Sequence, residues 1–428
     1  MMKKKTDHDA NTNPRILLVA HHANPEWTSE PLIGWRWASE LDRRADIELI
    51  THSRNRGAIE RAGGLRGKIH YVDTERTASV MNRINDRVWS KAAVVNRCFL
   101  DALALLAFDR EATRIARERV QADAIDIIHR VSPISPRFPT RLGTLGVPFV
   151  LGPVNGGLET APGFPEIEAR ESAGFQKLRS LARLLDPRQL TFRRASAILI
   201  ANETTRGVLP VEERSRATVV CENAVDLPSY TPSITRSGRT LRLLFVGRLL
   251  PYKGVHFILR AMSRADVDCT LDIVGDGPER RSLEALTELL GLQDRVRFRG
   301  AVPSDEIAGW MSRSDVFCFP SVRESGGSVV LEAMAAGTPA IVVDHGGPAE
   351  TVSAKTGIRL TGKSSEAVVR GLATCIEDLS RNETRRARLG REARRSVERH
   401  YSWTRKIDRV LEVYRGLVSE RREEAVAA

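Results

Sequence analysis

Residues 315–344 read DVFCFPSVRESGGSVVLEAMAAGTPAIVVD and carry the signals that decide the fold. The apolar run 315–320 is typical of a buried strand, and the run 339–344 has the same character. Between them, Ser and Gly-Gly suit the start of a helix and Gly-Thr-Pro suits its end, which predicts a helix at about 327–336. A strand, a helix and a second strand in this order form a βαβ unit, which is the building block of parallel sheets.

The same alternation extends in both directions from this unit. In the second half of the chain, the pattern predicts further strands at 241–247, 270–275 and 295–300, and helices at about 254–264, 279–290, 304–313 and 365–400. In the first half it predicts strands at 15–20, 46–51, 68–72, 126–129, 148–152 and 197–201, and long helices at about 80–121 and 171–194.

A stretch rich in Pro, Ser and Thr, DLPSYTPSITRSGRT (226–240), interrupts the alternation and is typical of a linker. The sequence therefore predicts an α/β protein of two doubly wound, Rossmann-like domains, residues 1–225 and 241–400, followed by a C-terminal helix within 401–428. In such sheets ligands bind beyond the carboxyl ends of the strands, so the turns between strands and helices are the candidate sites.

Composition limits the class of protein. Hydrophobic residues make up 42% and charged residues 28% of the 428 residues, as expected for a globular protein. The net charge of +12 divides evenly between the two halves, and aromatic residues are only 5%, which argues against a nucleic-acid-binding protein. Five scattered cysteines without metal-ligand spacing indicate reduced thiols, and no secretory signal or membrane-spanning run is visible. These features predict a cytoplasmic location.

Two glycine-containing turns of the second half are candidate ligand sites. FVGRLLPYKG (245–254) places Gly247, Arg248 and Lys253 between a strand and a helix, where cations and a helix N-terminus favour a diphosphate. VGDGP supplies Gly275 but lacks the third glycine of a dinucleotide fingerprint. At the end of the next strand, backbone groups of Gly300 and Val302 are candidates for contact with a base edge. Surface charges and a plain turn are the alternatives.

The loop after the strand at 315–320 and the helix that follows it contain two glutamates, Glu324 and Glu332 respectively. Two helical residues eight apart would lie about 12 Å apart along the axis, which exceeds the roughly 5–9.5 Å between the carboxyl groups of most glycosidases. With Glu324 in the loop, the two carboxylates instead bracket the free amides near Gly326, Gly327 and Ser328. This arrangement suits a clamp on a hydroxyl-rich, phosphorylated ligand, the alternative being two unrelated surface glutamates.

Several of these stretches together resemble one family. RESGGSVVLEAMAAGTPAIVVDHGG (323–347) is similar to the E-x7-E signature of retaining glycosyltransferases with the GT-B fold, specifically the family-four group. FVGRLLPYKG resembles the phosphate-binding turn of that family. VGDGPERRSLEAL (274–286), VRFRGAV (296–302) and ENAVD (222–226) match its other landmarks, so that the resemblance covers residues 222–403.

The resemblance implies a role for each matching residue. Arg248 and Lys253 would bind the nucleotide diphosphate, Glu324 the transferred sugar and Glu332 the nucleotide ribose. The glycines of the loop would present amides to the donor, and His129 would reach the donor sugar from the first domain. The family works without a bound metal or other cofactor, and its last helix crosses back to the first domain, which makes Trp403 a packing anchor.

The implied function is transfer of a hexose-type sugar, with retention, from a UDP- or GDP-linked donor to a glycan, a lipid-linked glycan or a small acceptor. Cell-envelope or exopolysaccharide biosynthesis is the expected setting. The alternatives are a sugar-nucleotide epimerase of the same fold and a non-catalytic nucleotide- or nucleic-acid-binding protein.

Two further stretches bear on the acceptor and the membrane. GPVNGGLETAPGF (152–164) follows a strand of the first domain and is expected to line the acceptor side, a plain ordered loop being the alternative. GFQKLRSLARLLDPRQLTFRR (174–194) mixes apolar and basic residues, as a helix at an anionic membrane surface would. A packed helix with a solvated basic face is the slightly favoured alternative.

Overall fold

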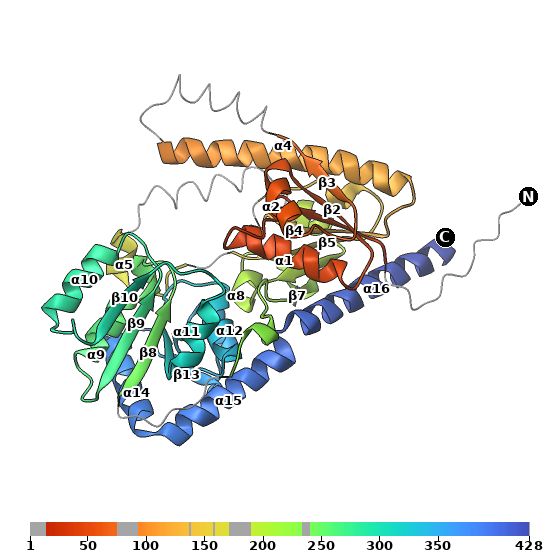
Figure 1. Ribbon diagram of the computed structural model, residues 1–428. Helices are drawn as coiled ribbons and strands as arrows, with labels where there is room; N and C mark the ends of the chain where they lie inside the picture. The colour runs from red at the N-terminus through yellow and green to blue at the C-terminus, as the bar shows by residue number, and fades with distance from the viewer. Residues whose placement is uncertain are drawn as a thin grey trace, which may run out of the picture.

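The computed structural model describes residues 14–74, 93–136, 138–156, 159–170, 190–232 and 240–427. Residues 174–189 of the basic helix predicted at 174–194, and residues 233–239 of the predicted linker, lie outside these described residues. The described elements form two lobes, each built around one parallel sheet (Figure 1). The predicted fold class is confirmed.

The first domain contains a seven-stranded parallel sheet in the order β3-β2-β1-β4-β5-β6-β7. Its strands are β1 (Ile16–Ala20), β2 (Ile47–His52), β3 (Ile69–Val72), β4 (Ile127–Ser132), β5 (Phe149–Val154), β6 (Ala197–Ile200) and β7 (Ala217–Val219). Its helices are α1 (Glu30–Asp42), α2 (Arg56–Arg61), α4 (Ala93–Gln121), α5 (Pro165–Arg170), α7 (Leu190–Arg193) and α8 (Glu203–Arg206).

A separate hydrophobic core covers each face of this sheet. Successive side chains of a strand point to opposite faces, so Leu17 of β1 packs with Phe108 of α4, whereas Leu18 packs with α1 and with Tyr414 of the C-terminal helix. Figure 1 accordingly shows α4 on one side of the sheet and α1 on the other. Because both faces are covered, β1 is apolar and buried throughout.

The second domain contains a six-stranded parallel sheet in the order β10-β9-β8-β11-β12-β13. Its strands are β8 (Leu241–Val246), β9 (Cys269–Val274), β10 (Val296–Gly300), β11 (Val316–Phe319), β12 (Ala340–Val343) and β13 (Gly357–Leu360). Its helices are α9 (Val255–Met262), α10 (Arg280–Leu289), α11 (Ile307–Arg313), α12 (Ser328–Ala335), α13 (Gly346–Thr351), α14 (Ser365–Arg381) and α15 (Glu383–His400).

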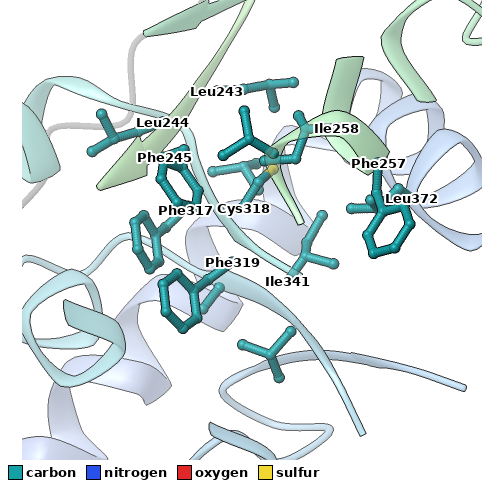
Figure 2. Packing of buried hydrophobic residues seen from close by; sticks show 14 of the residues in the cluster. Leu243, Leu244, Phe245, Phe257, Ile258, Phe317, Cys318, Phe319, Ile341 and Leu372 are labelled. Atoms are coloured by element: carbon teal, nitrogen blue, oxygen red, sulfur yellow. The ribbon is translucent and has the colours of Figure 1, made fainter. Parts of the chain in front are cut away.

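Aromatic side chains of the central strands fill the core of the second domain (Figure 2). The ring of Phe319 stacks against Phe245 with the centroids 6.0 Å apart and against Phe317 at 5.8 Å. These rings belong to β8 and β11, which are neighbours in the sheet. The carboxyl ends of β8 and β11, where the candidate turns begin, are therefore fixed by the core directly beneath them.

The prediction of one helix over 365–400 is wrong. The structure has two helices there, α14 and α15, and Asn382 lies between them with φ −123° and ψ 77°. The side chain of Asn382 accepts a hydrogen bond from the backbone N–H of Arg385 at 2.9 Å and so caps the second helix. Asn382 thus ends one helix and begins the next.

The chain crosses between the two domains in both directions. The helix α16 (Trp403–Ala427) runs back along the first domain (Figure 1), where Ile407, Val410 and Tyr414 are buried in the core. In the opposite direction, residues 159–168, here called the crossing segment, leave the first sheet after β5 and bury Phe164 in the core of the second domain. The ring of Phe164 lies 5.9 Å from that of Phe257.

None of the helices in the described parts of the chain is both long enough and apolar enough to cross a membrane.

Candidate functional site

Three of the predicted glycines meet at the carboxyl edge of the second sheet. The N–H of Gly247 donates to Val274 at 3.0 Å, and the N–H of Gly275 donates to the carbonyl of Gly300 at 2.7 Å. A Cβ on Gly275, whose φ is +129°, would lie 2.0 Å from the carbonyl oxygen of Gly247. Close packing of β8, β9 and β10 therefore requires glycine at this position.

These contacts decide which backbone groups at the end of β10 are free to hydrogen-bond to a ligand. The carbonyl of Gly300 already accepts a hydrogen bond from Gly275. By contrast, the backbone N–H and C=O of Val302 have no hydrogen-bond partner among the described residues. Of the two backbone positions predicted to contact a base edge, Val302 is the one with unoccupied groups.

The turn that follows β8 holds the two predicted cations. Arg248 is exposed, and its guanidinium makes no ion pair with any described residue. Lys253 ends a short 3-10 helix, Pro251–Lys253, and its ammonium lies 5.0 Å from the centroid of the Phe319 ring. The next residue, Gly254, has φ +75°, and a Cβ there would lie 2.3 Å from the carbonyl oxygen of Pro320. This glycine seats the turn on the end of β11.

The ammonium of Lys253 forms an ion pair with the carboxylate of Glu324. The other carboxylate oxygen of Glu324 accepts a hydrogen bond from the backbone N–H of Gly327 at 3.3 Å. Gly327 has φ +59° and immediately precedes Ser328, the first residue of α12. Lys253 and the N-terminus of α12 thus bind the same carboxylate, so their positive ends converge on one anion-binding position.

Glu332 lies in a different environment, within α12. The residue is partly exposed, but its carboxyl group is buried and accepts a hydrogen bond from the hydroxyl of Tyr230. Burial raises the pKa of Glu332 from 4.5 to about 7, against the opposing effect of this hydrogen bond. The two glutamates therefore have separate partners.

Gly326 is covered by the first domain. A Cβ on Gly326 would lie 2.0 Å from Oε1 of Glu222. Glu222 is only 2% exposed, and the same Oε1 accepts a hydrogen bond from the side chain of Asn155 at 2.7 Å. Burial raises the pKa of Glu222. In the sequence Glu222 appeared only as part of the ENAVD landmark, and no local signal placed it against this loop.

The structure contradicts the expectation that His129 reaches a donor sugar. The side chain is 0% exposed, and both ring nitrogens are engaged. Its Nε2 lies 2.5 Å from the carbonyl oxygen of Gly152, and its Nδ1 lies 2.5 Å from the hydroxyl of Tyr414 in α16. Burial lowers the pKa of His129 to about 4. His129 points to the face of the sheet that α16 covers, and it fastens this helix to β4.

Other polar side chains gather at the carboxyl ends of β1 and β4. The carboxylate of Glu30 accepts hydrogen bonds from the hydroxyl of Ser132 at 2.9 Å and from the N–H of Ile134 at 3.1 Å. His22 lies beside them, and its backbone N–H donates to Ser132 at 3.3 Å. Over the described residues, no group of three or more His, Cys, Asp or Glu side chains is arranged to hold a metal ion.

The second domain carries a family match. Residues 231–396 match the model described as glycosyl transferases group 1. This part of the chain is a glycosyl transferases group 1 domain. It contains Lys253, Glu324 and Glu332 together with the glycines of both turns.

Curated relatives agree with this match. The chain is 34% identical over 216 residues to a D-inositol 3-phosphate glycosyltransferase of Paenarthrobacter aurescens (strain TC1), an alignment that covers 47% of this chain and 52% of the relative. It is 32% identical over 227 residues to a 2-deoxystreptamine glucosyltransferase of Streptomyces kanamyceticus, covering 48% of this chain and 58% of the relative. The chain thus spans about half the length of the curated relatives it matches.

Solved structures share the fold over nearly the whole chain. HepE of Anabaena, solved in complex with UDP, has a TM-score of 0.61 and 17% identity, with 93% of this chain and 99% of that chain covered. Sucrose-phosphate synthase from Thermosynechococcus elongatus has a TM-score of 0.65 and 18% identity, with 95% of this chain and 100% of that chain covered. The group 1 domain and the domain before it together form the GT-B fold.

Proposed function

We propose that the chain transfers a hexose-type sugar, with retention, from a nucleoside diphosphate sugar to a hydroxyl-bearing acceptor. The observation that carries this proposal is the anion-binding position between Lys253 and the N-terminus of α12 in a group 1 domain. In the present arrangement the carboxylate of Glu324 occupies that position. A donor phosphate would replace it there and release Glu324 to accept hydrogen bonds from the sugar hydroxyls.

The proposed chemistry follows from the charge that develops in the reaction. The bond between the anomeric carbon and the diphosphate oxygen breaks, the acceptor oxygen bonds to the same face of that carbon, and the acceptor proton passes to the departing phosphate. Negative charge grows on the leaving group, where Arg248, Lys253 and the first amides of α12 would stabilise it. In this scheme Glu332 accepts hydrogen bonds from the ribose hydroxyls.

Relatives suggest which substrates to test first. UDP is the first nucleotide to test because HepE was solved in complex with it, and GDP is the alternative. Among acceptors, D-inositol 3-phosphate and 2-deoxystreptamine come first, since relatives are named for them. Glycan and lipid-linked glycan acceptors of cell-envelope or exopolysaccharide biosynthesis come next.

We propose a cytoplasmic location. Contact with anionic membranes through residues 174–194 is tested by measuring binding of the protein to anionic and to neutral vesicles.

The test has two stages. A thermal-shift screen against UDP, GDP and ADP identifies the nucleotide, and release of that nucleotide from its sugar is then measured with and without each acceptor. Acceptor-dependent release supports the transferase, whereas conversion of the donor sugar without an acceptor would indicate an epimerase, and nucleotide binding without either would indicate a binding protein.

Variants test the assigned residues. Lys253→Ala removes a charged contact of about 1.5–3 kcal/mol, so nucleotide affinity is expected to fall by about 10- to 150-fold. Glu324→Ala is expected to lose transfer while the protein stays folded. Near wild-type transfer by a folded double variant would refute this assignment.

A further inference from the structure

The loop that carries Glu324 is held in place by groups of the first domain. The backbone N–H of Ala161, in the crossing segment, donates to the carbonyl of Val322 at 2.8 Å. The side chain of Asn202 donates from Nδ2 to the carbonyl of Ser325 at 2.7 Å. Ser325 lies between Glu324 and Gly326, so the Asn202 contact is made directly on the backbone that carries the candidate sugar-binding carboxylate.

Asn202 performs two tasks that no carboxylate could perform together. It is 3% exposed and precedes α8, where its Oδ1 accepts hydrogen bonds from the N–H and from the hydroxyl of Thr205, both at 2.9 Å. Because this oxygen faces two donors, the opposite atom is the amide nitrogen, and it faces the carbonyl oxygen of Ser325. The amide therefore caps a helix of one domain and binds the loop of the other.

A second contact ties the same helix to the second domain in the reverse direction. The carboxylate of Glu350, in α13, accepts hydrogen bonds from the backbone N–H of Glu203 at 2.9 Å and from that of Thr204 at 3.3 Å. These are amides of the first turn of α8, which favour an anion. Since Glu350 holds α8 from one side and Asn202 holds the loop from the other, α8 and the loop are fixed relative to each other.

We propose that Asn202 is a positioning residue for sugar transfer, which fixes the backbone at Ser325 and thereby the direction in which Glu324 points. The inference rests on the proposed function, because it assigns Glu324 to the donor sugar. Without the amide, Glu324 keeps its ion pair with Lys253, but the loop backbone loses the one side-chain donor that Ser325 receives from the first domain among the described residues.

The decisive variant is Asn202→Asp. Aspartate keeps an oxygen for Thr205 and remains a good helix cap, but it turns an oxygen toward the carbonyl of Ser325 in place of the donor. The matched control is Glu203→Gln, which replaces a carboxylate by an amide at the next residue. Among the described residues, the exposed side chain of Glu203 pairs only with the half-buried Arg206. Its backbone contact to Glu350 is unaffected.

Two readouts separate the inference from the proposed function. Hydrogen exchange of residues 321–328 needs no substrate and is expected to be faster in Asn202→Asp than in the wild type, at a temperature well below the melting temperature of either protein. Turnover with the identified donor is expected to fall by about tenfold, the loss that corresponds to one buried hydrogen bond, while the acceptor KM stays the same. Glu203→Gln is expected to match the wild type in both.

Each outcome decides one point. Unchanged exchange in Asn202→Asp overturns the inference whether or not any donor is known. Faster exchange with undiminished turnover shows that the loop is held but that its position does not control transfer, which also overturns it. A wild-type protein that neither binds nor turns over any donor sugar instead overturns the proposed function, and the exchange result still shows whether Asn202 holds the loop.

Discussion

Replacing Glu332 with Gln is expected to stabilise the protein at pH 8 far more than at pH 5. Burial within α12 raises the pKa of this carboxyl group from 4.5 to about 7. Because the folded-state pKa lies above the unfolded value, the folded protein holds the proton more tightly than the unfolded chain does. Stability that is fully present below pH 4.5 is therefore lost as the pH rises through 7.

The size of the effect follows from the two pKa values. With 4.5 in the unfolded chain and about 7 in the folded protein, charging Glu332 reduces the free energy of unfolding by about 1 kcal/mol at pH 5 and about 3 kcal/mol at pH 8. The advantage of Glu332→Gln over the wild type should thus grow by about 2 kcal/mol across this range. Glutamine still accepts the hydrogen bond from Tyr230 and has no charge to bury.

Urea titrations of both proteins at pH 5 and pH 8 measure this difference. The control is Tyr230→Phe, which removes the hydroxyl that lowers the pKa of Glu332. This variant is expected to lose more stability at pH 8 than at pH 5, the opposite trend to Glu332→Gln. An advantage of Glu332→Gln that is equal at the two pH values would show that the carboxylate is not buried as described.

Three further changes test the backbone and the packing. Gly254→Ala forces a side chain into φ +75° and toward the carbonyl of Pro320, so it is expected to lower the free energy of unfolding, measured by urea titration, by about 1–3 kcal/mol and to weaken nucleotide binding. Gly416→Ala places its Cβ in open space on α16, so it is expected to raise the free energy of unfolding by about 0.5–1 kcal/mol in the same titration. Tyr414→Phe leaves Nδ1 of His129 without its partner and is expected to cost about 1–3 kcal/mol, with faster hydrogen exchange in α16 as the readout; unchanged exchange there would contradict the fastening role.

The sequence was sufficient for the central strands and for the turns of the candidate site because both are encoded locally. Strands buried on two faces are continuous apolar runs, and glycine marks the positions where strands approach one another too closely for a Cβ. The edge strands β7 and β13 were missed because they are short and include polar or partly exposed residues, whereas the equally short β11 and β12 are continuous apolar runs. The break at Asn382 was missed because a capping residue inside a long helical pattern is also compatible with an exposed helical position.

His129 shows why strand position alone does not assign a side chain to a site. A histidine near the end of β4 can point to either face of the sheet, and the choice depends on its parity in the strand and on what covers each face. The covering element is α16, whose Tyr414 lies 285 residues further along the chain. The residues near His129 in the sequence do not indicate its contact with Tyr414, so the prediction assigned His129 to the donor site instead of to the face of the sheet that α16 covers.

The candidate site depends on the same kind of distant contact. Phe164 of the crossing segment packs in the core of the second domain, and α16, which follows the second domain, packs on the first. Between these two crossings, Asn202 and Glu222 contact the loop at Ser325 and Gly326. Any rotation of one domain against the other must therefore move or break contacts on the loop that holds Glu324. The position of this carboxylate is a property of the two domains together, and the motif that contains it specifies only half of its surroundings.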